Sequence, residues 1–566
     1  MAKIKETVQL YTPEGEELLS GSICDTWDIY PRPMLKRESY YSLNGKWDII
    51  TDKGREEILV PFPPESVLSG IGRKIADNPH YSYEKKFTLP DGFVKDRVIL
   101  HFGAVDQICK LKLNGKYVGK HIGGYDAFCF DITDFLEKDN LLILEIEDNL
   151  DSHILPYGKQ KNKRGGMWYT PISGIWQSVW IESLPKNYIT SLDIDVTLDS
   201  ARIKFHGIDS GKVRVSTPNG EIFADINGGV ADIKISDPVN WTPENPHLYN
   251  FVANAGSDKI ESYFALRTLE VKTVDGYPRL CLNGKPYFFH ALLDQGYYPD
   301  GIFTPASPKC YENDVLFAKE YGFNTLRKHI KVEPECFYHY CDKHGIVVFQ
   351  DMVNNSHYSF LFDTALPTVG MQKFPDKLLH KNKESRAAYI ESMKKTVNQL
   401  KNHPSICMWT VFNEGWGQFC ADEMYNKIRE LDSSRFVDTT SGWFRAKNTD
   451  VESLHIYFKP VKLKKADKPL FISEFGGYSY KEKGHIFNED NTYGYGKYAD
   501  RGDFEDALIS LYEQQIIPNI KKGLCGTVYT QVSDVEDETN GLITYDRKFV
   551  KVDKERMNAL AKKLKI

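Results

Sequence analysis

From residue 271 onward, short apolar runs alternate with amphipathic stretches that have helical periodicity. This alternation is typical of βαβ units, whose strands form a parallel sheet that helices cover. The number of runs and the length of this region match a (β/α)8 barrel, so we predict a TIM barrel over residues 271–566. Its strands are expected at Tyr287–Leu293, Asn324–His329, Ile346–Asp351, Ile406–Glu414, Phe436–Ser441, Ser453–Tyr457, Leu470–Glu474 and Gly526–Asp534, and its helices at Lys309–Tyr321, Cys336–Lys343, Ser385–Lys401, Ala421–Leu431 and Phe504–Lys522.

The N-terminal half has a different pattern. Short segments of alternating apolar and polar residues are separated by turn signals such as Asn114–Gly115, a pattern typical of all-β domains. We predict a jelly-roll sandwich over residues 1–185 and a smaller immunoglobulin-like β-sandwich over residues 186–270. The expected fold class is therefore multidomain β plus α/β.

The composition is that of a folded globular protein, with 41% hydrophobic residues, 27% charged residues and a formal net charge of −6. No dense basic stripe is present, so a nucleic-acid partner is not expected. The N-terminal segment lacks the apolar core of a signal peptide, and no apolar run approaches the length of a membrane span. We expect a cytoplasmic protein without a membrane partner, whose ten cysteines are mostly buried thiols.

Two of the predicted barrel strands run into a glutamate. The segment Ile406–Trp416, ICMWTVFNEGW, is almost continuously apolar until Asn413 and Glu414, and Pro469–Gly477, PLFISEFGG, reaches Glu474 in the same way. TIM-barrel enzymes carry their chemistry at the C-terminal ends of the strands. Two carboxylates that face each other across one glycosidic bond can serve as the acid/base and the nucleophile of a retaining glycosidase.

Four regions spread over nearly the whole chain resemble one enzyme family. They read TWDIYPRPMLKRESYYSLNGKWDI, GGMWYTPISGIWQSVWIE, NTLRKHIKVEPECFYHYCDKHGIVVFQDM, and NHPSICMWTVFNEGWGQ together with PLFISEFGG. On these segments the chain resembles glycoside hydrolase family 2, the family of β-galactosidases, β-glucuronidases and β-mannosidases. The domain order of that family, jelly roll, immunoglobulin-like sandwich and barrel, is the order predicted above from the residue patterns.

The resemblance implies a role for five residues. Glu414 would be the acid/base and Glu474 the nucleophile. Asn413 would hydrogen-bond the sugar hydroxyl next to the anomeric carbon. Arg327 would hold Glu474 ionised, because a nearby guanidinium lowers the pKa of a carboxyl group, and Tyr457 would donate a hydrogen bond to the same carboxylate.

The chain departs from the family pattern in the segments that contact the sugar. β-Glucuronidases hold the sugar carboxylate with an Asn-x-Lys triplet, whereas this chain has Glu538–Thr539–Asn540, so a cation for a uronate is not expected there. Thr530 stands where the family usually has a tryptophan that stacks on a pyranose. The second strand reads RKHIKVEP, a variant found in members that include furanoside-cleaving enzymes. A galactofuranoside or an α-L-arabinofuranoside is therefore a candidate substrate.

Five more residues at strand ends could contact sugar hydroxyls or satisfy buried neighbours, and both interpretations stay open: Asp294, His329, Trp443, Gln531 and Glu536. No metal-ligand spacing is evident, and neither a metal nor another cofactor is expected. The long segment Tyr478–Gly502, which follows Glu474, is either a lid over the substrate or a surface excursion.

The function predicted from these observations is that of an exo-acting, retaining glycoside hydrolase. It would act without a cofactor on a small carbohydrate substrate, a glycoside or an oligosaccharide. Two alternatives remain, a carbohydrate-binding protein with an inactive barrel and a transglycosylase that uses the same residues. The sequence does not indicate an oligomeric state.

Overall fold

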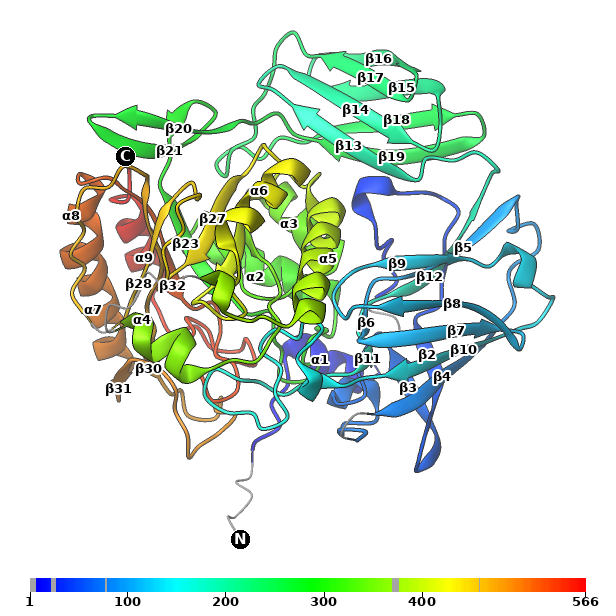
Figure 1. Ribbon diagram of the computed structural model, residues 1–566, viewed down its shortest axis with the longest axis horizontal. Coiled ribbons are helices and arrows are strands. Elements are labelled where there is room, and N and C mark those ends of the chain that lie inside the picture. The colour runs from blue at the N-terminus through cyan, green and yellow to red at the C-terminus, as the bar shows by residue number, and fades with distance from the viewer. Residues whose placement is uncertain (1–6, 22–26, 77–78, 369–375, 458) are drawn as a thin grey trace.

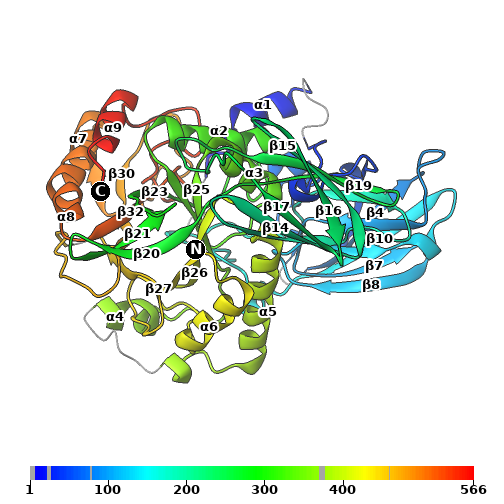
Figure 2. The same ribbon diagram turned by 90° about the horizontal axis from the view of Figure 1, so that it is seen from above.

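The computed structural model describes residues 7–21, 27–76, 79–368, 376–457 and 459–566. Two β domains lie beside a barrel whose helices surround its strands (Figures 1 and 2). The first β domain and the barrel lie side by side, and the second β domain lies across the top of both in the view of Figure 1. This arrangement confirms the predicted fold class.

The first domain consists mainly of two antiparallel sheets that enclose a common apolar core. In strand β10 every second residue is buried, as expected when one face of a sheet packs on the core. One sheet has the order β1 (Tyr41–Ser42), β12 (Val179–Leu184), β5 (Arg97–Phe102), β9 (Phe128–Asp131). The other has the order β3 (Gly54–Val60), β2 (Gly45–Thr51), β4 (His80–Phe87), β10 (Asn140–Glu147), β7 (Ile108–Leu113), β8 (Lys116–Ile122).

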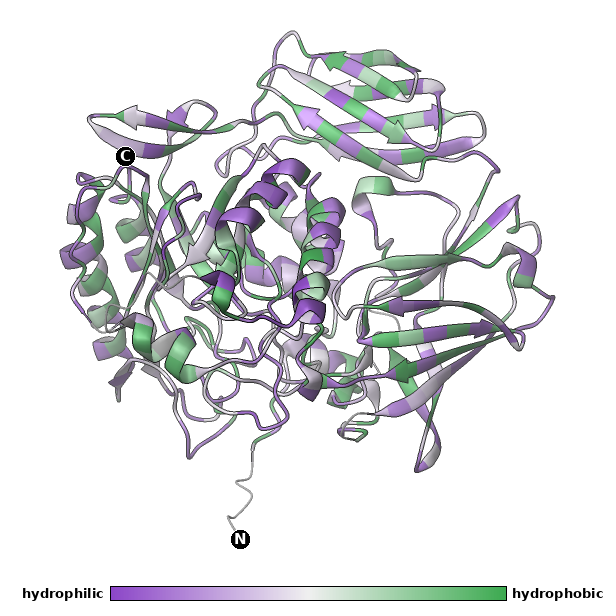
Figure 3. Ribbon diagram, viewed as in Figure 1, coloured by the Kyte–Doolittle hydropathy of each residue, from purple (hydrophilic) through white to green (hydrophobic). Residues whose placement is uncertain are grey.

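The second domain has seven antiparallel strands around its own core. Hydrophobic and hydrophilic bands alternate along these strands (Figure 3). The strands are β13 (Ser191–Val196), β14 (Ser200–His206), β15 (Ser210–Thr217), β16 (Gly220–Asn227), β17 (Val230–Lys234), β18 (Tyr249–Ala255) and β19 (Asp258–Phe264).

The barrel contains all eight predicted strands, each within a few residues of its expected position. Their neighbouring ladders are parallel, and every residue of β26 is buried, as the apolar run in its sequence indicated. The strands are β23 (Phe289–Asp294), β24 (Thr325–Lys328), β25 (Val347–Asp351), β26 (Ile406–Asn413), β27 (Phe436–Ser441), β28 (Glu452–Ile456), β29 (Leu470–Gly476) and β32 (Leu524–Thr530).

The seam between β27 and β28 is closed by side chains. The hydrogen-bonded order runs from β27 through β26, β25, β24, β23, β32 and β29 to β28, and no backbone pairing joins its two ends among the described residues. Ser453 bridges the gap instead: its hydroxyl donates to Asp438 Oδ2 at 2.8 Å, and its oxygen lies 2.6 Å from Ser473 Oγ, whose hydroxyl can donate to it. Polar side chains therefore fill this part of the barrel wall.

The predicted helices are present, and side chains cap several of their N-termini. Ser307 caps α2 and Asn382 caps α5 by accepting backbone N–H groups of the first turn. The stretch predicted as Phe504–Lys522 is divided into α7, a π-helical turn at Tyr512–Ile516 and α8, which contains Pro518. The helices are α1 (Pro13–Leu19), α2 (Pro308–Glu320), α3 (Glu335–His344), α4 (Leu366–Thr368), α5 (Lys383–Leu400), α6 (Ala421–Leu431), α7 (Arg501–Leu511), α8 (Ile517–Ile520) and α9 (Lys554–Ala561).

The nine described cysteines are free thiols, and seven of them are buried; Cys24 lies outside the described residues. Within the described part of the chain, no helix combines the length and the apolarity needed to cross a membrane.

Candidate active site

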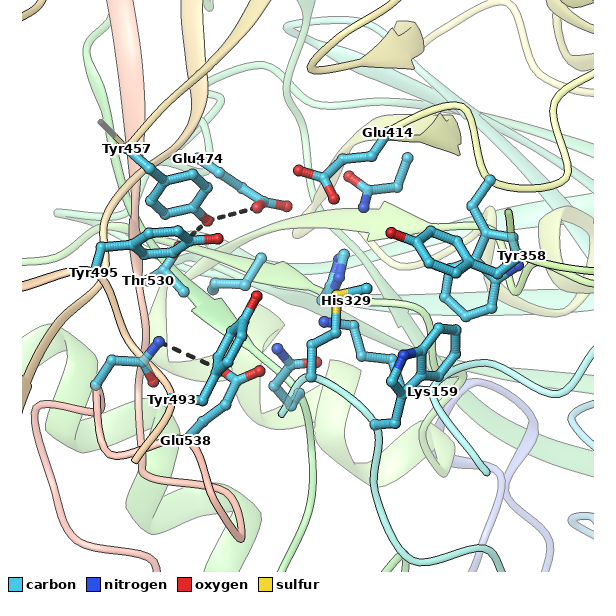
Figure 4. Close-up of a pocket in the computed structure, with 17 residues that line it drawn as sticks. Lys159, His329, Tyr358, Glu414, Tyr457, Glu474, Tyr493, Tyr495, Thr530 and Glu538 are labelled. Carbon is cyan, nitrogen blue, oxygen red and sulfur yellow. Dashed lines mark hydrogen bonds between the residues drawn. The ribbon is translucent and has the colours of Figure 1, made fainter. Parts of the chain in front are cut away.

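A pocket lies at the C-terminal ends of the barrel strands, and both predicted catalytic carboxylates line it (Figure 4). Glu414 directly follows β26, and Glu474 lies near the end of β29. Of the other residues predicted for the site, Asn413, His329 and Tyr457 also line the pocket. The structure thus brings together side chains from strands that are far apart in the sequence.

Glu414 is held by the turn that ends β26. Its backbone adopts the left-handed conformation, with φ of 52°, and its N–H donates to the carbonyl oxygen of Ser441 at 2.8 Å. Gly415 follows because a Cβ at this position would lie 2.0 Å from the ring of Phe444. A non-glycine residue in the left-handed region is uncommon and often marks a functional site. The Glu414 side chain retains 21% exposure, so it can reach a ligand.

Glu474 is more deeply buried and is held ionised. Arg327 Nη1 donates to its Oε1 at 3.2 Å, and Tyr457 Oη donates to its Oε2 at 2.6 Å. Burial alone raises the pKa of the carboxyl group, but the groups around it, among them the Arg327 guanidinium and the Tyr457 hydroxyl, outweigh burial and lower the pKa of Glu474 to about 2. A nucleophilic carboxylate needs this bias toward the charged form.

Arg327 fixes the predicted sugar-binding amide as well. The guanidinium is buried and donates to Asp351 Oδ1 at 3.0 Å and to Asn413 Oδ1 at 2.9 Å. Because arginine only donates hydrogen bonds, the atom of Asn413 that faces it must be the carbonyl oxygen. The Asn413 amide group is then oriented with its N–H donors available for a sugar hydroxyl.

A loop of the first domain forms one wall of the pocket. Its residues were not among the site residues predicted from the sequence. Trp168 lies in this loop, and its ring meets that of Trp416 edge to face with centroids 4.7 Å apart. Tyr169 Oη donates to Glu538 Oε1 at 2.9 Å, and the N–H of Thr170 donates to Glu536 Oε1 at 2.8 Å. The segment GGMWYT, quoted above for the family resemblance, was the available signal, although its sequence does not reveal which domain it contacts.

Lys159 from the same domain also lines the pocket. No cation for a uronate was expected, because the strand-eight segment lacks a lysine. That expectation considered the barrel alone, whereas Lys159 reaches the pocket from a different domain. Its positive charge acts to lower the pKa of Glu538, although burial dominates and leaves that pKa raised. The pocket therefore contains an ammonium group in addition to its carboxylates.

The segment that follows the nucleophile contributes two tyrosines to the pocket, Tyr493 and Tyr495. It contains two short parallel strands, β30 (Tyr478–Tyr480) and β31 (Gly496–Tyr498). The ring of Tyr495 stacks on that of Tyr457, with centroids 4.0 Å apart and an interplanar angle of 19°. Thr530 lines the pocket where a tryptophan would be expected. Aromatic surface is therefore supplied by this segment in addition to the barrel strands.

Four of the other five candidates do not line the pocket but lie in the structure around it. Asp294 forms an ion pair with Lys328 at 2.6 Å, and Trp443 meets the ring of His455 edge to face at 5.6 Å. Gln531 donates to Glu538 Oε2 at 2.9 Å, and Glu536 binds the first-domain loop. His329 does line the pocket, where its Nδ1 lies 2.6 Å from Asp351 Oδ2. The first four therefore have protein partners or packing contacts in the pocket wall.

His455 is a site residue that the sequence analysis missed. Its Nδ1 lies 2.8 Å from Glu414 Oε1 and 3.5 Å from Glu474 Oε2, and its side chain has no exposed surface. One oxygen of each glutamate and this nitrogen all lie within 4.8 Å of one another. Two members of this trio are the predicted catalytic carboxylates, so the imidazole lies against both of them. Alternation along β28 was the missed signal, because residues two apart share a face and Tyr457 had been predicted.

Comparison with protein families gives consistent matches along the chain. Residues 70–185 match the sugar binding domain of glycosyl hydrolases family 2, residues 181–267 match a further family 2 domain, and residues 305–559 match the family 2 TIM barrel domain. The three matches follow the order of the domains described above.

Individual relatives are more distant. A β-galactosidase of Thermoanaerobacter pseudethanolicus is 26% identical over 62% of this chain but only 47% of its own length, so the chain spans about half of that relative. A β-D-glucuronidase of Dictyoglomus thermophilum superposes with a TM-score of 0.72 at 19% identity, covering 94% of this chain and 98% of the other. A β-galacturonidase of Eisenbergiella tayi bound to galacturonate superposes with a TM-score of 0.68 at 18% identity, covering 95% of this chain and 99% of the other. Both superpositions support the fold.

Proposed function

Because this chain belongs to glycosyl hydrolase family 2, we propose that it hydrolyses a terminal glycosidic bond with Glu414 as acid/base and Glu474 as nucleophile. The observation that carries the proposal is the juxtaposition of these two carboxylates at adjacent walls of one pocket. The surroundings of the two carboxylates differ in the way that an acid/base and a nucleophile require. Glu474 is buried and held ionised by Arg327 and Tyr457, whereas Glu414 is more exposed.

The proposed reaction proceeds in two steps with retention of anomeric configuration. Glu414 donates a proton to the departing oxygen while Glu474 bonds to the anomeric carbon, and water then displaces Glu474 after giving a proton to Glu414. The short separation supports this course, since carboxylate oxygens within 4.8 Å of each other leave little room for the water of an inverting mechanism. Asn413 would bind the neighbouring hydroxyl in both steps.

The pocket walls support exo-cleavage of a small terminal sugar. The first-domain loop with Trp168 and the segment with Tyr493 both add to the barrel mouth. We propose a β-galactosidase-like enzyme that accepts a furanoside, either galactofuranose or α-L-arabinofuranose. Support comes from Thr530, whose small side chain offers no stacking platform for a pyranose ring.

A terminal uronide is a second candidate, favoured by Lys159. Its ammonium group lines the pocket, and a carboxylate on the sugar would complement it. The two candidates differ in charge, so they can be separated by substrate.

The test is a panel of 4-nitrophenyl glycosides, namely β-D-galactopyranoside, β-D-galactofuranoside, α-L-arabinofuranoside, β-D-mannopyranoside, β-D-glucuronide and β-D-galacturonide. Turnover of one sugar that is lost in Glu474→Ala supports the proposal and identifies the substrate. Binding of a sugar by calorimetry without turnover of any glycoside would instead indicate an inactive, carbohydrate-binding barrel. Product analysis with alcohol acceptors separates hydrolysis from transglycosylation.

A further inference from the structure

The imidazole of His455 is built into the seam of the barrel beside the acid/base. The residue belongs to β28, the strand that is joined to β27 by side chains. Gly442 leaves space for it, since a Cβ at this glycine would lie 2.7 Å from His455 Nδ1. With Trp443 against its edge, the ring has a defined position next to Glu414.

The hydrogen bonds of the ring define its role. Nδ1 lies 2.8 Å from Glu414 Oε1, and Nε2 lies 3.2 Å from the hydroxyl oxygen of Ser441. A neutral imidazole with its proton on Nδ1 satisfies both contacts, because it donates to the carboxyl group and accepts from the serine hydroxyl. In this tautomer the ring points an N–H at Glu414, and Ser441 is the partner of the second nitrogen.

The charges around the ring come from several elements. On β29, Glu474 Oε2 lies 3.5 Å from Nδ1, and its charge is balanced by Arg327 from β24. On β27, Asp438 accepts a hydrogen bond from Ser453, and burial raises the pKa of Asp438 to about 6. Tyr457 follows on the same strand face, with ring centroids 6.5 Å apart. His455 is therefore the group that touches both carboxylates.

On the basis of the proposed function, we infer that His455 is a positioning residue that makes Glu414 Oε1 a permanent acceptor, so that Oε2 carries the proton that is transferred. In the first step the Oε2 proton moves to the glycosidic oxygen as the carbon–oxygen bond breaks and Glu474 bonds to the anomeric carbon. In the second step a water proton moves to Oε2 as the water oxygen displaces Glu474. The Nδ1–H donates to Oε1 in both steps and never leaves the imidazole.

This role predicts which substitutions the site tolerates. In His455→Asn the amide nitrogen can take the place of Nδ1 and still donate to Oε1, whereas His455→Leu removes the donor while keeping an apolar side chain of similar size. General acid catalysis contributes about 10²- to 10⁴-fold. Part of that factor should be lost in the leucine variant, and only when the leaving group needs a proton.

The experiment compares kcat/KM of the wild-type protein, His455→Asn and His455→Leu on two glycosides of the sugar that the panel identifies. One has a methyl leaving group and the other a 2,4-dinitrophenyl group, which departs without protonation. We expect His455→Leu to lose about 10- to 100-fold on the methyl glycoside and less than about 3-fold on the dinitrophenyl glycoside, because only the acid step is affected. His455→Asn should recover most of the loss.

The pH profile and a matched control complete the test. The basic limb of kcat/KM reports the acid, so it should shift in His455→Leu and stay close to wild type in His455→Asn. His206→Asn serves as control, because His206 makes a similar contact at 2.8 Å with Asp193 in the second domain, away from the pocket. Thermal unfolding of each variant identifies loss of the fold.

Four results would overturn the inference. One is equal loss on both leaving groups with an unchanged pH profile, which indicates a structural role alone, and another is full activity of His455→Leu on the methyl glycoside. The third is loss in His455→Leu on the methyl glycoside alone that His455→Asn does not recover, because the amide would restore the donor. The last is absence of turnover by the wild-type protein on every glycoside, which contradicts the proposed function and the inference with it.

Discussion

The hydroxyl oxygen of Thr530 lies 2.9 Å from the phenolic oxygen of Tyr457. Tyr457 has one hydroxyl proton and directs it to Glu474 Oε2, 2.6 Å away, so Thr530 must donate and Tyr457 accept. The threonine that replaces the expected tryptophan therefore orients the hydrogen bond to the predicted nucleophile. Loss of a stacking surface and gain of a hydrogen-bond donor occur at the same position.

Thr530→Val should lower activity while preserving the shape of the pocket. The valine leaves the Tyr457 oxygen with one partner fewer, at a cost of about 1–2 kcal/mol, or roughly 5- to 30-fold in kcat/KM. Thr530→Ser retains the hydroxyl and should remain near wild type. Steady-state kinetics of both variants test this, and equal activity of valine and serine would show that the hydroxyl plays no part.

The acid limb of the pH profile should depend on Arg327. Glu474 must be ionised to attack, and its pKa is lowered to about 2, so kcat/KM of the wild-type protein should not fall because of this group above about pH 4. Arg327→Gln removes a positive charge, raises the pKa of Glu474 and should move the acid limb to higher pH.

The pH profiles must be recorded at pH values where the wild-type protein and Arg327→Gln both remain folded. Removing one partner of a buried ion pair costs about 3–5 kcal/mol of stability. Asp351 would lose the same partner, so far-UV circular dichroism at each pH is the control. An acid limb that coincides in the two proteins would contradict the assigned role of Arg327.

Lys159→Met should change selectivity according to the charge of the sugar. If the substrate is a uronide, loss of the ammonium group should reduce kcat/KM by about 10- to 100-fold, since truncating one partner of a desolvated charge pair costs 2 kcal/mol or more. A neutral furanoside should be affected less. Lys204→Met, at an exposed position of β14, is the matched control. An identical effect on uronides and neutral sugars would argue against recognition of an anion.

Trp168→Ala should weaken substrate binding with little effect on the chemical step. The Trp168 indole forms part of the pocket wall but does not belong to the cluster of Glu414, His455 and Glu474. Loss of an aromatic contact of about 1–2 kcal/mol corresponds to a KM increase of roughly 5- to 30-fold. Tyr117→Ala changes an aromatic residue that is 58% exposed in the first domain and should have no effect. A fall in kcat with unchanged KM would contradict the prediction.

The barrel and its two glutamates were predictable because the local sequence determines them. A strand buried on both faces needs an apolar run such as Ile406–Phe412, and the run ends where Asn413 and Glu414 reach the pocket. Tyr457 and Arg327 were assigned through the family resemblance, and the structure places both on Glu474.

The rest of the pocket depends on contacts between segments far apart in the sequence. Trp168 and Lys159 enter from the first domain, and no local pattern reveals which domain a loop will touch. Tyr493 and Tyr495 belong to a segment whose path depends on β30 and β31. Asp294 occupies a strand end, as the catalytic residues do, yet it pairs with Lys328 rather than facing the pocket, a distinction that only side-chain geometry provides.

Covalent trapping tests the central assignment most directly. The protein is incubated with the 2-deoxy-2-fluoro analogue of the sugar that it turns over, carrying a dinitrophenyl leaving group, and its digest is analysed by mass spectrometry. Fluorine slows both steps and the good leaving group restores the first, so the glycosyl-enzyme accumulates. We expect one added fluorosugar on the peptide that contains Glu474, and none in Glu474→Gln. A label on a different residue, or turnover with inverted configuration and no label, would contradict it.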